Sequence, residues 1–417
     1  MPSAAQLEAV LRRHVLDAWF PRCLDTAHGG FLCDFDRAWN SAGPHDKLLE
    51  FQGRHLCVAA DACVQYPDEP RFRAAMEHGF RYLREVMWDR SAGGWFHCLD
   101  RAGKPLEHDT KHAHGIAYAL DACTAVYEAS QDPAALELAK AGFEWLDRHA
   151  RDREHGGYFG LLTRDGRIIR RSDECPWPTT IDTIGTPLGL KDLNVQSDLL
   201  ETFTRLYRIW PDAVLADRLA ECYDIIDNRM TLPGIGAMHF YAMPDWRPVP
   251  HLVRAGYQFQ AAYRLTLAAE LTGARDAARR RAIELVDHLL RFSRDPNGGF
   301  FYATVGALPN ELQEQRITIQ PKPWWVQVEG LKTLLIMSRL VPEDPRYQQE
   351  FSALWQVVLD QYVDSRHGGF FAFAVRRRHR LLGVLPRQLA AKGNPWKDAR
   401  HEARALLTCI ESLRENH

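Results

Sequence analysis

The sequence predicts an all-α fold, an (α/α)6 barrel whose short β-hairpins gather at one face. The first observation is a repeat: a Gly-Gly pair followed by aromatic and apolar residues occurs five times along the 417 residues, and a sixth, degenerate copy joins them at a spacing of about 62 to 80 positions. The second is that an amphipathic helical pattern precedes each copy and another follows it. Recurrence of one helix–hairpin–helix unit is typical of a repeat architecture that closes around a shared core.

The repeated motif is clearest in Arg366–Phe373, which reads Arg-His-Gly-Gly-Phe-Phe-Ala-Phe. The other copies, in chain order, are His28–Leu32, Ala92–Phe96, His155–Phe159, the degenerate Ile235–Phe240, and Asn297–Phe301. A Gly-Gly pair permits the positive φ of a tight turn, and the residues after it suit a short, half-buried strand. An Asp stands three or four residues before the first glycine of most copies. Each module is therefore predicted to contain a small hairpin.

The helical patterns before the copies carry one apolar stripe and many charges, as outer, solvent-facing helices do. These are expected at Ala5–Trp19, Pro70–Met87, Pro133–Ala150, Ala213–Met230, Asp276–Phe292 and Tyr347–Tyr362. The patterns after the copies are apolar over more of their circumference, which predicts buried, inner helices. These are expected at Lys47–Tyr66, Lys111–Ser130, Leu193–Trp210, Leu252–Thr272, Trp324–Leu340 and Arg400–Arg414. Since each hairpin joins an outer helix to the next inner one, the starts of all inner helices share one face.

With 46% hydrophobic residues and no low-complexity run, the chain can bury a large core, and the repeats favour one closed domain spanning residues 1–417. With 52 Lys plus Arg against 54 Asp plus Glu, nothing indicates a nucleic-acid or membrane partner. The basic run Arg376–Arg380 is expected to be a solvated turn. Nine cysteines without a CxxC pair, and no signal peptide or long apolar stretch, predict a reduced, cytoplasmic protein. The protein is expected to be a monomer or homodimer, and the sequence does not decide between them.

The first turns of the expected inner helices concentrate polar, aromatic and histidine side chains. Prominent among them are Glu50, Arg54, His112, His114, Asn194, Asp198, Tyr257, Gln260, Trp324, Trp325, Glu329, Trp396 and His401. Solvated helix ends would also be polar, but they would seldom need three tryptophans, whose faces suit stacking on a sugar ring. Convergent polar groups in a concave mouth are typical of a ligand site. The pattern therefore predicts a carbohydrate pocket.

Three side chains are candidates for chemistry. His401 shares a helix face with the small or apolar Ala405 and Cys409, so it is expected to point inward as a catalytic group. His114 is a similar candidate, with a structural role equally open. Arg54 needs an anionic or hydroxyl partner, because an unpaired buried guanidinium is very costly; a structural salt bridge is its alternative role.

A metal or cofactor is not expected. The short pair His112 and His114 has no third His, Cys or carboxylate at a recognisable ligand spacing. The sequence also has no P-loop, no GxGxxG after a strand and no Gly-x-Ser-x-Gly motif.

At these residues the chain resembles the N-acylglucosamine 2-epimerase superfamily, which includes cellobiose 2-epimerases and mannose isomerases. The motifs that carry the resemblance are Phe51–Arg54, Lys111–Gly115, Asn194 with Leu200-Glu201 and Leu206-Tyr207, Trp324–Glu329, and Pro395-Trp396-Lys397 followed by His401. The resemblance implies reversible proton transfer at C2 of a small reducing sugar through an enediolate, with two histidines as bases and no redox cofactor. Imidazole can accept and donate protons near neutrality, and Arg54 would stabilise the developing oxyanion.

The chain departs from the family pattern around the second base. His401 falls on one family histidine, but the other falls on Tyr257, and the glutamate that follows it falls on Gln260. A third family histidine falls on Asp198, and His114 stands where cellobiose epimerases often have tyrosine. The second base therefore stays open among His114, Asp198 and Tyr257. A one-base reaction and loss of the activity are the remaining alternatives.

The hypothesis from sequence is an aldose 2-epimerase or aldose–ketose isomerase. Its catalytic residues would be His401, Arg54, His114 and Tyr257, and its substrate-binding residues Asn194, Asp198, Gln260, Trp324, Trp325, Glu329 and Trp396. One alternative is a glycoside hydrolase that uses Asp198, Glu201 and Glu329 as paired carboxylates. Another is a sugar-binding protein without chemistry, motivated by Tyr257 and Gln260. The long segment Ser172–Lys191 is expected at the pocket rim.

Overall fold

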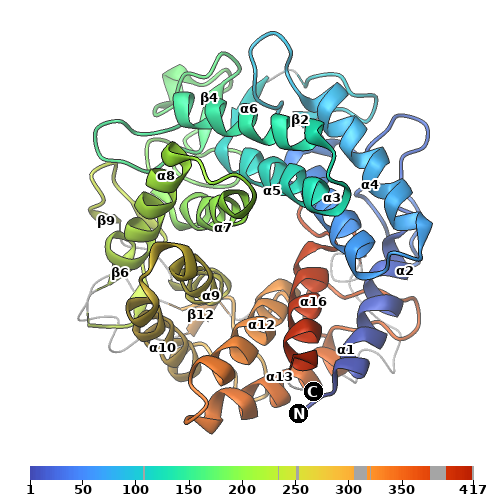
Figure 1. The fold of residues 1–417 in the computed structure, drawn as a ribbon, viewed down its shortest axis with the longest axis vertical. Helices are drawn as coiled ribbons and strands as arrows, with labels where there is room; N and C mark the ends of the chain where they lie inside the picture. Colours follow the sequence, from blue (N-terminus) through green and yellow to red (C-terminus); the bar gives the residue numbers. More distant parts are fainter. Residues whose placement is uncertain are drawn as a thin grey trace.

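Two concentric rings of helices surround a central axis, and the N- and C-termini lie side by side (Figure 1). The computed structural model describes residues 1–106, 109–232, 234–249, 253–304, 317–319, 321–375 and 391–415. The basic run Arg376–Arg380 lies outside the described residues. The predicted (α/α)6 barrel is confirmed.

The inner ring consists of helices whose residues are buried at nearly every position. Its members are α3 (Leu49–Gln65), α5 (Ala113–Ser130), α7 (Leu193–Ile209), α9 (Ala255–Thr272), α12 (Trp324–Leu340) and α16 (Arg400–Arg414). Each helix packs against the next, and α16 packs against α3, which closes the ring. Because these helices bury residues on almost every side, they depend on the neighbouring helices and on partners for their buried polar groups.

The outer ring consists of amphipathic helices, three of which contain a π-helical segment. Its members are α1 (Ala4–Leu11) with η1 (Arg12–Leu16) and α2 (Asp17–Trp19), α4 (Pro70–Tyr82) with η2 (Leu83–Met87), α6 (Pro133–His149), α8 (Ala213–Asp224) with η4 (Ile225–Arg229), α10 (Arg275–Phe292) and α13 (Pro345–Gln361). In α10 the buried stripe includes Ala278, Ala282, Leu285 and Leu289, three or four residues apart, while its arginines face outward. All predicted helices are present, with ends within three residues of the expected ones.

The repeated Gly-Gly motif forms a tight turn after each outer helix. Both glycines of the five full copies have φ between 65° and 93°, a region that favours glycine. A single antiparallel bridge flanks each of these turns, for example Leu24 with Phe31 and Val363 with Phe370. In the degenerate copy, β6 (Thr231–Leu232) pairs with β7 (Ala237–Met238). The predicted turns are confirmed, but the residues on either side of a full Gly-Gly turn pair through one bridge and form no longer ladder.

A buried Asp–Lys pair anchors every full copy of the turn. In the first copy Asp25 accepts hydrogen bonds from backbone N–H groups of the turn and pairs with Lys47 at 2.9 Å. The pairs Asp89–Lys111, Asp152–Lys191, Asp295–Lys322 and Asp364–Lys392 repeat this contact. Each lysine immediately precedes an inner helix or the loop that leads to it, so the pair ties the turn to the start of that helix.

The extended residues before each inner helix pair with the next module rather than with their own. The strands are β1 (Lys47–Leu48) with β2 (Cys98–Leu99), β3 (Thr110–His112) with β4 (Leu161–Thr163), β5 (Lys191–Asp192) with β8 (Tyr241–Ala242) and β9 (Pro248–Val249), and β10 (Val253–Arg254) with β11 (Ala303–Thr304) and β12 (Ile317–Ile319). Single bridges from Pro323 to Phe373 and from Phe35 to Gly393 complete the circle. The first residues expected in three inner helices are therefore extended, because their backbone groups pair across to the neighbouring module.

All nine cysteines are free thiols, and seven of them are buried. Among the described helices, none combines the length and the apolar character needed to cross a lipid bilayer.

Candidate active site

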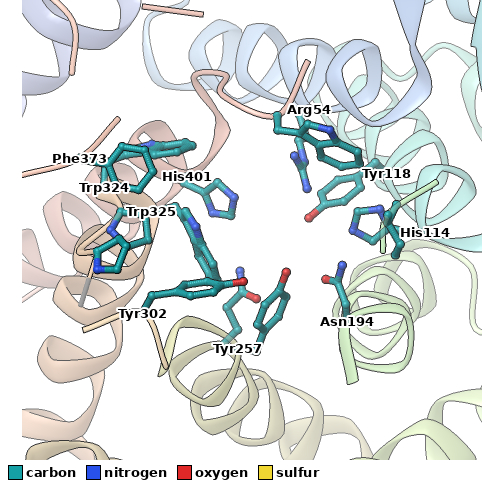
Figure 2. Close-up of a pocket in the computed structure, with 15 residues that line it drawn as sticks. Arg54, His114, Tyr118, Asn194, Tyr257, Tyr302, Trp324, Trp325, Phe373 and His401 are labelled. Carbon is teal, nitrogen blue, oxygen red and sulfur yellow. The ribbon is translucent and has the colours of Figure 1, made fainter. Parts of the chain in front are cut away.

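A cavity of about 580 Å³ opens where the inner helices begin, and the fifteen residues that line it come from all six of them and from the surrounding loops (Figure 2). The lining residues that lie on helices follow the helical periodicity. The second residue of α5, α7, α12 and α16 lines the cavity, and so does the sixth residue of α3, α5 and α9. Positions four residues apart lie on one helix face, so one face of each helix is directed at the axis.

Nine of the eleven residues expected in the site line this cavity. They are Arg54, His114, Asn194, Tyr257, Gln260, Trp324, Trp325, Trp396 and His401. Asp198 and Glu329 do not line it; they lie behind the wall and bind its histidines. Ile184 belongs to the segment Ser172–Lys191 and lines the cavity, which places this segment at the rim.

His401 has one ring nitrogen tied to a carboxylate. Its Nδ1 lies 2.7 Å from Oε1 of Glu329. Burial alone would raise the pKa of Glu329, but Arg404 and Lys332 hold it well below its usual range, so it is an ionised acceptor. Nδ1 therefore carries the proton, and Nε2 of the neutral ring carries a lone pair. Burial lowers the pKa of His401 below its ordinary 6.5, so the ring is neutral at pH 7 and can act as a base.

Arg54 provides a fixed positive charge in the same cavity. Its Nη1 pairs with Asp398 at 3.3 Å, and its guanidinium lies 4.1 Å from the centroid of the Tyr118 ring. Burial opposes the charge, but Tyr118 and Asp398 outweigh it and raise the pKa of Arg54. Asp398 also accepts a hydrogen bond from the backbone N–H of Arg400, at the start of the helix that carries His401. This contact fixes Arg54 relative to His401.

His114 is held between two carboxylates. Its Nδ1 lies 2.9 Å from Oε1 of Glu50, and its Nε2 lies 3.1 Å from Oδ2 of Asp198. Burial lowers its pKa, but the two carboxylates outweigh burial and raise the pKa to about 9. The ring is therefore an imidazolium at pH 7, without a lone pair for an incoming proton.

Tyr257 forms the part of the wall contributed by α9. Its ring packs on Trp325 and Phe240, with centroid distances of 5.1 and 4.9 Å, and Figure 2 shows its hydroxyl turned into the cavity. Gly256 makes room for this packing, because a Cβ there would lie 2.1 Å from the Trp325 ring. Burial raises the pKa of Tyr257 far above the ordinary 10, so it is a neutral hydroxyl.

Aromatic rings cover the side of the cavity next to His401. The Trp325 ring lies 5.6 Å from the imidazole, and the Trp324 ring lies 6.3 Å from it. Trp396 is 43% exposed and stands at the mouth, 6.4 Å from the His114 ring. Flat apolar faces beside hydrogen-bonding groups suit a ligand with one C–H surface and many hydroxyls.

Sequence reasoning missed six lining residues: Tyr118, Ile184, Tyr302, Pro321, Pro323 and Phe373. A signal for Tyr118 was available, because it follows His114 by four residues on the same helix. Tyr302 directly precedes β11, and Phe373 lies in a single bridge to Pro323, so both reach the cavity from places where neighbouring modules pair. No pattern within one module could have placed them.

A buried ionic network lies behind the wall and connects its two sides. Arg264 binds Asp198 at 2.5 Å and Glu201 at 2.8 Å. Arg404 binds Glu201 at 2.6 Å and Glu329 at 2.7 Å. Charges of opposite sign thus alternate from the partner of His114 to the partner of His401. Paired in this way, buried charges avoid the large cost of isolation.

The same network bears on the three carboxylates considered for glycoside hydrolysis. Asp198, Glu201 and Glu329 do not line the cavity. The pKa of each lies below its usual range, because neighbouring arginines outweigh the effect of burial. A hydrolase needs a protonated carboxyl group that reaches the glycosidic oxygen, and none of these three offers one.

One trio of potential metal ligands, Cys33, Asp34 and His45, places its ligand atoms within 4.8 Å of one another, away from the cavity-lining set. Its donors already have partners: Nδ1 of His45 accepts the backbone N–H of Asp34, and Nε2 lies 2.6 Å from Oγ of Ser41. These contacts describe a hydrogen-bonded loop.

The fold and the cavity define an (α/α)6-barrel protein with a polar, aromatic-walled pocket at the mouth of its inner ring. Within this class, the chain belongs to the N-acylglucosamine 2-epimerase (GlcNAc 2-epimerase) family, whose profile matches residues 29–136 and 216–387, about two thirds of the chain. The matched ranges include Arg54, His114 and Tyr257 but not Asn194, Trp396 or His401.

Known proteins resemble the chain over its full length. The cellobiose 2-epimerase of Bacteroides fragilis is 24% identical over 420 residues, covering 98% of both sequences. The structure of cellobiose 2-epimerase from Bacillus thermoamylovorans superposes with a TM-score of 0.84 at 21% identity, covering 98% of both chains. A crystal structure of D-mannose isomerase superposes with a TM-score of 0.79 at 18% identity, covering 100% of this chain and 99% of that one.

Proposed function

We propose that this protein is an aldose 2-epimerase or aldose–ketose isomerase that moves a proton at C2 of a reducing sugar. The observation that carries the proposal is the pair of His401 and Arg54 in one cavity: a neutral imidazole with a free nitrogen beside a fixed guanidinium. Family membership and the cellobiose 2-epimerase and D-mannose isomerase relatives support it.

The reaction begins with the open-chain aldose in the cavity. Nε2 of His401 takes the proton from C2, the C2–H electron pair forms the C1–C2 double bond, and O1 gains the negative charge of an enediolate. Negative charge builds on O1 as C2 loses its proton, so Arg54 stabilises the transition state more than the neutral aldose. The protonated imidazole then returns the proton to carbon. Substrate and product are isomers, so the reaction needs no external oxidant or reductant.

The remaining lining residues would hold the sugar. Asn194 and Gln260 each offer both a donor and an acceptor to hydroxyl groups. The Trp325 face lies next to His401 and would stack on the C–H surface of the sugar, which fixes C2 relative to Nε2. Correct placement of the reacting carbon supplies much of the rate in such proton transfers.

The test is proton NMR in heavy water with mannose, glucose, fructose, N-acetylmannosamine and cellobiose. The proposal expects loss of the C2 proton signal of at least one aldose. His401→Ala should slow this exchange by about 10²- to 10⁴-fold, the usual contribution of a general base. His155→Ala is the matched control, because His155 lies in a turn away from the cavity-lining set. Sugar binding without exchange would contradict the proposal, and so would new reducing ends released from cellobiose.

A further inference from the structure

The side of the cavity that carries His401 and the side formed by α9 differ in whether they can remove a proton from a sugar carbon. Six titratable side chains are among the described lining residues: Arg54, His114, Tyr118, Tyr257, Tyr302 and His401. His401 offers an unprotonated nitrogen, as its contact with Glu329 requires. His114 is hydrogen-bonded through Nδ1 to Glu50, and its Nε2 lies 3.1 Å from Oδ2 of Asp198. Arg54 is ion-paired with Asp398 and stays charged.

The α9 wall carries Tyr257 rather than a base. Its phenol is seated between Phe240 and Trp325, and Gly256 leaves the space in which Trp325 packs against it. The charge of Arg254 acts to lower the pKa of Tyr257, but burial in this aromatic setting outweighs it and raises the pKa. The hydroxyl can hydrogen-bond a sugar oxygen, but it does not accept a proton from carbon at neutral pH.

Epimerisation and isomerisation make different demands on these walls. To invert C2, the enediolate must receive a proton on the face opposite the one from which it was removed. In the reverse reaction the group on that second face must remove the same proton, so a group that can both donate and accept a proton is needed on each face. To form a ketose, one base on one face suffices, because the proton taken from C2 returns to C1 on the same side.

We infer that this protein, if it acts by the C2 proton transfer proposed above, is a one-face aldose–ketose isomerase in which Tyr257 prevents 2-epimerisation. His401 takes the C2 proton, and the enediolate forms. The O2 proton moves to O1, the imidazolium returns its proton to C1, and the C2 carbonyl of the ketose forms. All atoms of the aldose reappear in the ketose, and His401 ends as it began. Read backwards, the same face delivers hydrogen to C2, so the ketose regenerates one C2 configuration only.

The decisive measurement is the order in which products appear. The sugar that exchanges fastest in the heavy-water screen is prepared with deuterium at C2 and incubated with the protein in ordinary water. The expected result is a ketose as first product, part of it with deuterium at C1, and 2-epimer below about 1% of the ketose at early times. Early 2-epimer at a rate comparable with that of the ketose would overturn the inference and leave the C2 chemistry intact.

Two substitutions of Tyr257 test its role in the product ratio. Tyr257→His places an imidazole on the α9 wall and is expected to raise the epimer-to-ketose ratio at least tenfold. Tyr257→Phe removes the hydroxyl without adding a base, so it should lower the rate while the ratio stays that of the unmodified protein. Circular dichroism checks the fold of both. An unchanged ratio in folded Tyr257→His protein would overturn the assignment of Tyr257; if that variant does not fold, the product order of the unmodified protein decides.

The exchange and product measurements distinguish failure of the one-face inference from failure of the proposed function. Without C2 exchange for any sugar in the screen, both fail together. With C2 exchange and early epimer, only the one-face inference fails.

Discussion

His401 and His114 occupy equivalent places and have opposite chemical states. Each is the second residue of an inner helix, α16 and α5 respectively, and both line the same cavity. His401 has one carboxylate partner, whose charge is shared with Arg404 and Lys332. His114 has a carboxylate at each nitrogen. The first is a neutral base and the second is a cation.

The position on the helix determines where each histidine lies, whereas its carboxylate partners determine whether it is neutral or protonated. Glu50 and Asp198, which hold His114, come from α3 and α7, while Glu329, which holds His401, comes from α12. An imidazole titrates near neutrality, so one additional carboxylate is enough to move it from base to cation.

Removing each imidazole in turn is the most direct test of the difference between His401 and His114. His401→Gln should reduce C2 exchange by about 10²- to 10⁴-fold, because the base is lost. His114→Gln leaves the base in place, so the loss should stay below about tenfold, measured as kcat on folded protein. Equal losses in the two variants would show that the two histidines share the proton transfer.

The next effect concerns the carboxylate behind the base. Glu329→Gln removes the charge that fixes the His401 tautomer, so kcat should fall by roughly 10²-fold. Without that charge the imidazolium is less stable, and the acid limb of the pH–rate profile should move to lower pH. The matched variant Glu50→Gln changes the partner of His114 and should leave the acid limb where it is. A shift of the acid limb in the Glu50→Gln variant would contradict the assignment of His401 as the base.

A smaller effect is expected on stability. The pKa of His114 is raised in the folded protein, to about 9, so its contribution is complete below the unfolded value near 6.5 and is lost as the pH rises through about 9. His114→Gln should therefore lower the free energy of unfolding at pH 6 by on the order of 1–3 kcal/mol. Urea unfolding at pH 6 and pH 10 checks this; a deficit of the same size at both values would contradict a charged His114.

The smallest expected effect is the position of the acid limb in the unmodified protein. Burial lowers the pKa of His401; Glu329 and Asp398 oppose this, and Arg54 reinforces it. The reaction needs the unprotonated ring, so kcat/KM should rise with pH through a pKa below 6.5 and be flat by pH 7. An acid limb above pH 7 would mean that another group must lose its proton first.

Local sequence predicted the fold well, because each module repeats the same signals. The Gly-Gly turn at Gly368 and Gly369, for example, needs positive φ at both positions, and the apolar stripe of α10 follows directly from residue spacing. The partners of the repeated aspartates were not predicted. Lys47 lies 22 residues after Asp25, in what looked like the first turn of a helix, and only the folded chain brings the two together.

The site was predicted as a set of positions rather than as a mechanism. Arg54, Trp325 and His401 were found because they begin inner helices, and helix starts meet at one mouth. Asp198 and Glu329 were assigned to the sugar because they also lie in the polar first turns of inner helices. The structure instead brings Arg264 and Arg404 against them, which keeps both carboxylates behind the wall.

By itself the sequence determined the six-module barrel, the end at which its pocket opens, and most of the side chains that line it, because these depend on periodicity and turn chemistry within about 70 residues. Only the tertiary structure decided which histidine is neutral, which is charged and which wall lacks a base. Those properties depend on burial and on charges from other helices, such as Glu50 on α3 beside His114 on α5, and no local pattern encodes distances between helices.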